Sequence, residues 1–146
     1  MKPEVDQLLG LCAAQIAAEL APLLPAGYAQ GQATLNAVML SLAAQQYDRA
    51  AEIRVAENRD LRALFAELAP LVTDASLKTQ LGAASRGEDA SLRIAALNEA
   101  NYALRRLLIA LHAHIEDAPG VVARAAERRI WSVLRAAAGR RQLVLG

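Results

Sequence analysis

The sequence is short of cysteine, aromatic residues and long apolar runs. Cys12 is the only cysteine, which excludes an intramolecular disulfide and a thiolate metal cluster and suits a reducing compartment. Phe65 is the only Phe and Trp131 the only Trp, so the core must be mainly Leu, Ala, Ile and Val. No apolar run approaches the ~20 residues that span a bilayer, since Gln15 and Glu19 interrupt the best candidate. We therefore expect a cytoplasmic protein that does not enter a membrane.

A large excess of one charge is also lacking. The formal net charge is +1, whereas nucleic-acid-binding domains are usually strongly basic, so we expect no nucleic-acid partner. The charge is nevertheless uneven along the chain. Residues 1–123 hold ten Lys or Arg against fourteen Asp or Glu, and residues 124–146 hold six Arg against Glu127 alone. The C-terminal segment is thus an electropositive end on a mildly acidic chain.

Hydrophobic residues make up 55% of the 146 residues, and many of them are alanine. Alanine has the highest helix propensity and lets helices approach closely. The length suits one domain. We therefore predict a single all-α domain over 1–146, an antiparallel bundle of four to five helices with short connections, which ends in a basic and apolar tail from about residue 140.

The N-terminal half predicts two helices. The first covers about 3–23, with a kink or early stop near Ala21 because Pro22 removes a backbone donor. The second covers about 34–69. Its polar middle is typical of a solvent-exposed helix, and it is either continuous or broken near Tyr47.

The C-terminal half predicts three more helices. Thr73 or Asp74 can cap a short one. The next carries a wide apolar stripe from Leu92 to Ile115 and should lie at the centre of the bundle. The last follows Pro119 and ends near residue 139.

The second and fourth of these helices share the motif N-x-x-L-R-x-L-[F/L]-x-x-L at a constant offset of 43 residues. Any amphipathic helix would repeat the leucines, but not the Asn and the Arg in the same phase. The motif therefore predicts two equivalent helix halves. Its positions are Asn58, Leu61, Arg62, Leu64, Phe65 and Leu68, and Asn101, Leu104, Arg105, Leu107, Leu108 and Leu111.

The shared polar residues allow two interpretations. Asn58 and Asn101 can be buried amides that fix the register of the two helices, with Arg62 and Arg105 flanking the seam and reaching acidic neighbours. Alternatively, Asn58, Asn98 and Asn101 line a polar pocket between the halves.

The runs AENRDLRALF (residues 56–65) and NYALRRLLIALH (residues 101–112) resemble segments of small uncharacterised bacterial all-helical proteins. The resemblance covers roughly the middle and the C-terminal half of the chain. It implies an all-helical fold. Because those proteins have no established activity, it implies no functional residues.

The sequence holds little that predicts catalysis or metal binding. On a helix, His112 and Glu116 share a face while His114 points elsewhere, so at most one His and one carboxylate of this group could serve one metal ion. A polar helix end is the simpler interpretation. No Gly-x-Ser-x-Gly elbow and no phosphate-binding glycine loop occur. We therefore assign no catalytic residue, metal or cofactor.

Arg124, Arg128, Trp131 and Arg135 follow i, i+4, i+7, i+11 spacing and form one stripe of the last predicted helix. The stripe is either a solvated arginine face, with the indole beside the core, or a site for an anion. Arginines that stack on a tryptophan suit an acidic protein surface or a nucleotide-like or acyl-CoA-like ligand.

Two hypotheses for function remain. The first is a non-enzymatic helical protein–protein interaction module that forms a homodimer, because the apolar surface, including the tail of residues 143–145, exceeds what one small bundle buries. The second is a small-ligand binder or auxiliary enzyme with an inter-helix pocket, in which Asn58, Asn101 and nearby arginines bind an anionic ligand.

Overall fold

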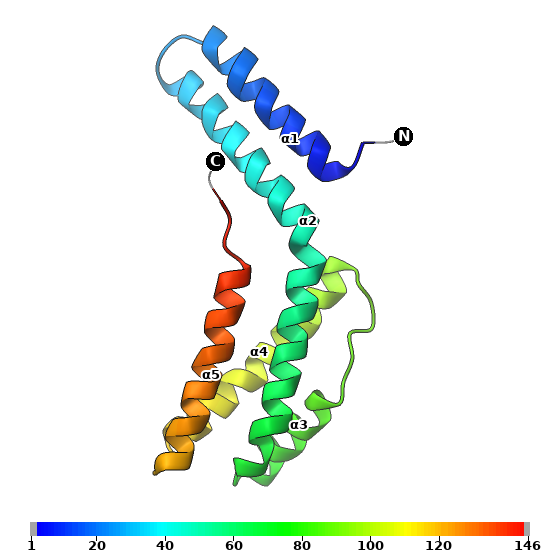
Figure 1. The fold of residues 1–146 in the computed structure, drawn as a ribbon, viewed down its shortest axis with the longest axis vertical. Helices are drawn as coiled ribbons and strands as arrows, with labels where there is room; N and C mark the ends of the chain where they lie inside the picture. Colours follow the sequence, from blue (N-terminus) through cyan, green and yellow to red (C-terminus); the bar gives the residue numbers. More distant parts are fainter. Residues whose placement is uncertain (1–2, 145–146) are drawn as a thin grey trace. The chain divides into compact units, whose positions relative to one another are not determined.

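The computed structural model describes residues 3–144, and across them it holds five α-helices packed against one another and no strand (Figure 1). This confirms the predicted all-α class. Residues 3–50 and 142–144 belong to one compact unit, the N-terminal unit, and Ala51–Arg141 form a second, the C-terminal unit. The helices are α1 (Val5–Gln15), α2 (Tyr28–Leu68), α3 (Ala75–Ser85), α4 (Ile94–Glu116) and α5 (Val121–Arg140).

The chain leaves regular α geometry after α1, as Pro22 predicts. A π-helical turn covers Ile16–Leu20, and a 3₁₀ turn with Pro22 covers Ala21–Leu23. The N–H of Ala21 bonds to the carbonyl of Ile16. Proline has no N–H to continue the α ladder, so the change of helix type is concentrated just before it.

Helix α2 is continuous through Tyr47, and it begins at residue 28 rather than near residue 34. Gly27, with a φ of +137°, provides the left-handed turn that lets the helix start earlier. The polar middle of α2 is not wholly exposed, contrary to expectation. Ile53, Glu57 and Asn58 are all buried.

The core of the C-terminal unit lies among α2, α3, α4 and α5. The buried positions of α4 alternate between four- and three-residue spacing, which is the pattern of helices that pack side by side. Leu92, which we expected on this stripe, precedes α4 and is exposed. Helix α4 contacts both α3 and α5. Its buried residues are Leu97, Asn101, Leu104, Leu108, Leu111 and Ile115.

Specific residues set the starts of the last helices. Asp74, one of the two predicted caps, accepts a 2.7 Å hydrogen bond from the N–H of Leu77 at the start of α3. Gly120 has a φ of +106° and precedes α5 directly, so the turn after Pro119 needs a glycine there.

The N-terminal unit buries much smaller side chains than the C-terminal unit does. Among its described residues, the buried apolar side chains are all alanines: Ala13, Ala21 and Ala37. Its larger apolar residues stay partly or mainly exposed. Across residues 3–144, no helix combines the length and the apolar character needed to cross a membrane.

Leu111→Ala tests the core of the C-terminal unit. Leu111 is fully buried, so its truncation should lower the free energy of unfolding by about 2–5 kcal/mol. Ile109→Ala is the matched control on the same helix, because Ile109 is 70% exposed and should cost less than about 1 kcal/mol. Urea denaturation followed by Trp131 fluorescence measures both. Equal losses would contradict the assigned face of α4.

Candidate functional site

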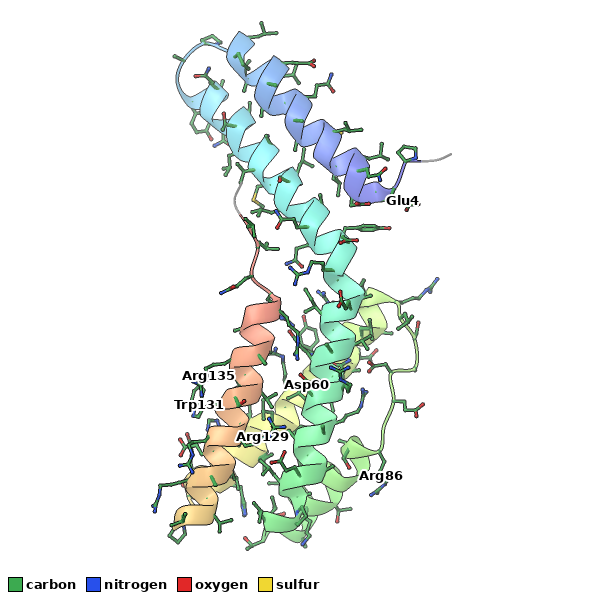
Figure 2. All side chains as sticks on the ribbon, viewed as in Figure 1. Glu4, Asp60, Arg86, Arg129, Trp131 and Arg135 are labelled. Carbon is green, nitrogen blue, oxygen red and sulfur yellow. The ribbon has the colours of Figure 1, made fainter. Side chains whose placement is uncertain are left out.

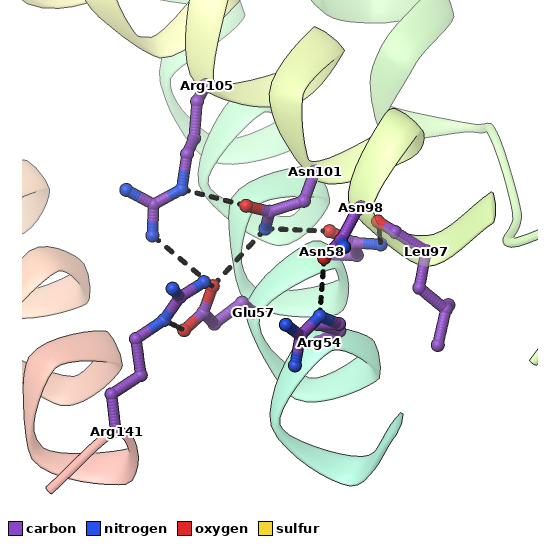
Figure 3. A network of polar contacts seen from close by, with 8 residues as sticks. All are labelled: Arg54, Glu57, Asn58, Leu97, Asn98, Asn101, Arg105 and Arg141. Carbon is purple, nitrogen blue, oxygen red and sulfur yellow. Dashed lines mark hydrogen bonds and ion pairs between the residues drawn. The ribbon is translucent and has the colours of Figure 1, made fainter. Parts of the chain in front are cut away.

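The carboxylate of Glu57 in α2 is the centre of a polar network in the C-terminal unit (Figure 3). Its side chain is 1% exposed. Arg141, directly after α5, donates from Nε to Oε1 over 2.5 Å and from Nη2 to Oε2 over 2.7 Å. Arg105 in α4 donates from Nη2 to Oε2 over 3.3 Å. Charged donors of this kind offset the cost of removing a carboxylate from water.

Asn58 and Asn101, the two asparagines of the repeated motif, form a buried amide pair beside Glu57. Asn101 Nδ2 donates to Asn58 Oδ1 over 2.9 Å and to Glu57 Oε2 over 3.3 Å. Asn101 Oδ1 accepts from Nε of Arg105 over 2.9 Å. Asn58 Nδ2 donates to Oδ1 of Asp89 over 2.9 Å. The pair therefore joins α2, α4 and the connection before α4, as expected of amides that fix register.

The remaining polar residues of the predicted pocket are also engaged. Nη2 of Arg62 donates to Oδ1 of Asp89 over 2.7 Å, and both side chains are largely buried. Oδ1 of Asn98 accepts from Nε of Arg54. One buried donor of this group, Nε of Arg62, has no partner among the described residues. Both motif arginines thus reach acidic side chains, one on the α3–α4 connection and one on α2.

Burial alone would raise the pKa of Glu57, but the hydrogen bonds and positive charges of Arg141 and Arg105 outweigh it. The pKa of Glu57 is therefore held below its ordinary value. In turn, the hydrogen bond that Arg141 donates to Glu57 raises the pKa of Arg141. The network consequently keeps its charges at neutral pH.

The network leaves little room for a ligand beside Glu57 and Arg105, whereas Arg62 and Asp89 line a wider hollow of about 470 Å³. The space next to the network, lined by Glu57, Arg105 and Leu108 among others, has a volume of about 10 Å³. This is room for about one water molecule. Asn58, Asn98 and Asn101 all bond to protein groups.

The predicted arginine stripe lies on the exposed side of α5. Figure 2 shows Trp131 and Arg135 on one side of the helix and Arg129 on another. Arg124, Arg128 and Arg135 are exposed, and among residues 3–144 none of them has an ion-pair partner. The stripe is therefore an exposed, positively charged surface, on which Nε of Arg135 donates to the carbonyl of Trp131 over 3.4 Å.

The indole of Trp131 is 47% exposed, and its ring contact among the described residues is with a histidine. The rings of Trp131 and His112 meet edge to face, with centroids 5.5 Å apart. Among residues 3–144, none of the stripe arginines stacks on the indole. His112 instead connects the stripe to α4.

Glu127 of α5 joins His112 and Glu116, so the two α4 residues have a third polar neighbour that the sequence did not reveal. One ligand atom from each of the three side chains lies within 4.8 Å of the others. His114 points elsewhere, as expected, and its Nε2 accepts a 3.2 Å hydrogen bond from the N–H of Thr73.

The N-terminal unit contains an apolar groove of about 520 Å³. Helix α1, the first part of α2 and the tail residue Val144 contribute to it. Gln45 holds this tail, because its amide donates to the carbonyl of Val144 over 2.8 Å and accepts from its N–H over 3.1 Å. Leu145, the last apolar residue of the predicted tail, lies outside the described residues. The groove is lined by Gly10, Ala13, Ala14, Ala17, Thr34, Ala37, Val38, Ser41, Leu42 and Val144.

Sequence reasoning missed Glu57 and Arg141 as site residues. Glu57 stands in phase with Ile53 and Leu61 on the buried face of α2, and this phase is a signal for a buried charge. Arg141 gives no such signal, because it follows the last helix and was assigned to a tail.

No protein-family model, curated protein or solved structure matches this chain.

Glu57→Gln tests the network. The free energy of unfolding at pH 7 should fall by about 1–3 kcal/mol, because two guanidinium groups lose a charged acceptor but are exposed enough to regain water. A lowered pKa contributes stability that is present above the ordinary glutamate pKa of 4.5 and is lost as the pH falls through the folded value. The wild type should therefore lose stability below about pH 4.5, and the variant should lose less.

Glu67→Gln provides the control, because Glu67 pairs with Arg129 at the surface and both side chains are more than 40% exposed. It should change stability by less than about 0.5 kcal/mol. Urea titrations of the wild type and both variants between pH 3 and 7 measure these effects. An unchanged acid dependence in Glu57→Gln would contradict the assigned role.

Proposed function

We propose that this protein is a non-enzymatic helical interaction module that associates with a second copy of itself through the N-terminal unit. The observation that carries the proposal is the absence of large buried side chains among the described residues of that unit. Two helices that bury only alanines remove little apolar surface from water, so most of the available hydrophobic stabilisation is unrealised. A partner that covers this surface supplies the missing burial.

The composition of the hairpin that α1 and the first part of α2 form in the N-terminal unit favours an apolar partner. Glu19 is the only charged residue between Gln7 and Gln46. Depletion of charge is typical of the centre of a protein–protein interface. An uncharged surface also sets up no like-charge repulsion when two identical copies meet.

The shape of the hairpin fits a second copy. Its groove is lined mainly by Gly, Ala and Ser, so a neighbouring helix can approach closely. The same hairpin exposes large apolar side chains that can enter such a groove, including Leu8, Leu11 and Met39. A surface that offers both the groove and the groups to fill it suits a two-fold symmetric dimer, in which each copy does both.

Val38→Glu tests the dimer. Val38 lines the groove and is 38% exposed, so a carboxylate can be hydrated in one copy but would be buried without a partner between two. Light scattering at micromolar concentration should give twice the 15.5 kDa chain mass for the wild type and the single mass for the variant.

Leu92→Glu is the control, because Leu92 is 71% exposed and belongs to the C-terminal unit. It should remain dimeric, and circular dichroism should show unchanged helix content in both variants. A monomeric wild type would refute the proposal, whether or not the same hairpin binds lipid vesicles.

A second candidate function is binding of an acidic protein surface at the arginine stripe. It is favoured by the exposed arginines of α5 that lack ion-pair partners within residues 3–144. Arg128→Glu reverses the charge at the centre of the stripe and should change stability by less than about 0.5 kcal/mol. Binding of an acidic model peptide, followed by Trp131 fluorescence, should weaken in the variant and with added salt. Equal binding by both proteins would exclude this site.

A further inference from the structure

We propose that His112, Glu116 and Glu127 form a binding site for a divalent transition-metal ion of the Zn²⁺ type. The site joins α4, which carries the first two residues, to α5, which carries the third. It is independent of the surface proposed for self-association, since all three residues belong to the C-terminal unit.

The geometry brings three donor atoms together. Nε2 of His112 and Oε1 of Glu116 are 3.5 Å apart, one helical turn from each other. With Glu127, the three donors lie within 4.8 Å of one another. Ligands of one metal ion at ~2.0–2.2 Å bond lengths lie about 3–4 Å apart, so a small rotation of the carboxylates completes the set.

The imidazole supplies a separate indication. Nε2 of His112 is buried and has no hydrogen-bond partner among the described residues. Its 3.5 Å contact with Glu116 is longer than an ordinary hydrogen bond. A buried ring nitrogen without a partner is costly, and coordination of a metal ion is one way to satisfy it.

The two carboxylates give a further indication of a bound cation. Glu127 has no ion-pair partner within residues 3–144, yet it lies close to the carboxylate of Glu116. Two anionic groups repel each other at this separation unless a cation lies between them. A divalent ion would remove this repulsion and hold α4 against α5.

The donor set indicates the class of metal. Imidazole favours Zn²⁺, Cu²⁺ and Ni²⁺ over Mg²⁺ and Ca²⁺, whereas an all-oxygen site favours the latter. One nitrogen and two oxygens from the protein leave further positions for water. Arg124 and Arg128, which lie on α5 with Glu127, add positive charge. They should reduce the affinity for the metal ion relative to that of a structural zinc site.

Trp131 makes the site directly observable. It is the only tryptophan, and its ring centroid is 5.5 Å from that of His112. Co²⁺, which has unpaired d electrons, should quench the fluorescence of the full chain in a saturable way. Zn²⁺ should compete with this quenching and should raise the melting temperature, because it binds the folded state.

Four variants test the assignment. His112→Gln and Glu127→Gln should each weaken Zn²⁺ binding about ten-fold or more in calorimetric titrations. His114→Gln and Glu99→Gln, on α4 but outside the cluster, should bind as the wild type does. Glu127 and His112 lie on different helices. If one of the two substitutions prevents folding, the other variant still tests the site.

The outcomes separate clearly. Loss of Zn²⁺ binding in both cluster variants, with both controls intact, supports the site. Absence of Zn²⁺ binding in the wild type overturns it. Equal binding of Mg²⁺ and Zn²⁺, or Zn²⁺ binding that survives His112→Gln, also overturns it, because the histidine would then have no part in coordination.

Discussion

The C-terminal unit depends on the neutralisation of one carboxylate inside a helix interface. Removal of Glu57 from water is costly, and only donors with suitable geometry on both oxygens offset that cost. The donors come from α4 through Arg105 and from the end of α5 through Arg141. A shift of either segment by one helical turn would leave the charge without them. The requirement therefore selects one register of α2, α4 and α5 from many that the leucines alone would allow.

The two units meet the demands of burial in opposite ways. The C-terminal unit buries Phe65, many leucines and a hydrogen-bonded polar network within one chain. The N-terminal unit has a single charged residue, Glu19, between Gln7 and Gln46, and among its described residues no large side chain is buried. Its alanines allow close approach of helices but offer little volume. One unit has the features of a complete core, and the other has those of half an interface.

Periodicity predicted all five helices, because the phase of apolar residues is local information. The shared Asn and Arg of the repeat also predicted that α2 and α4 face each other. Arg141 could not be predicted as a partner of Glu57, since the two meet only after α5 has packed. The same holds for Glu127, which approaches His112 from another helix. Leu92 was misassigned because the apolar pattern extends to it, although α4 begins only at Ile94.

Helix α2 passes from one unit to the other without a linker, since residues 50 and 51 both lie within Tyr28–Leu68. Recombination at this boundary would place the ends of two unrelated helices inside one hydrogen-bond ladder. An exchange of either unit with another protein would therefore have to include a section of α2.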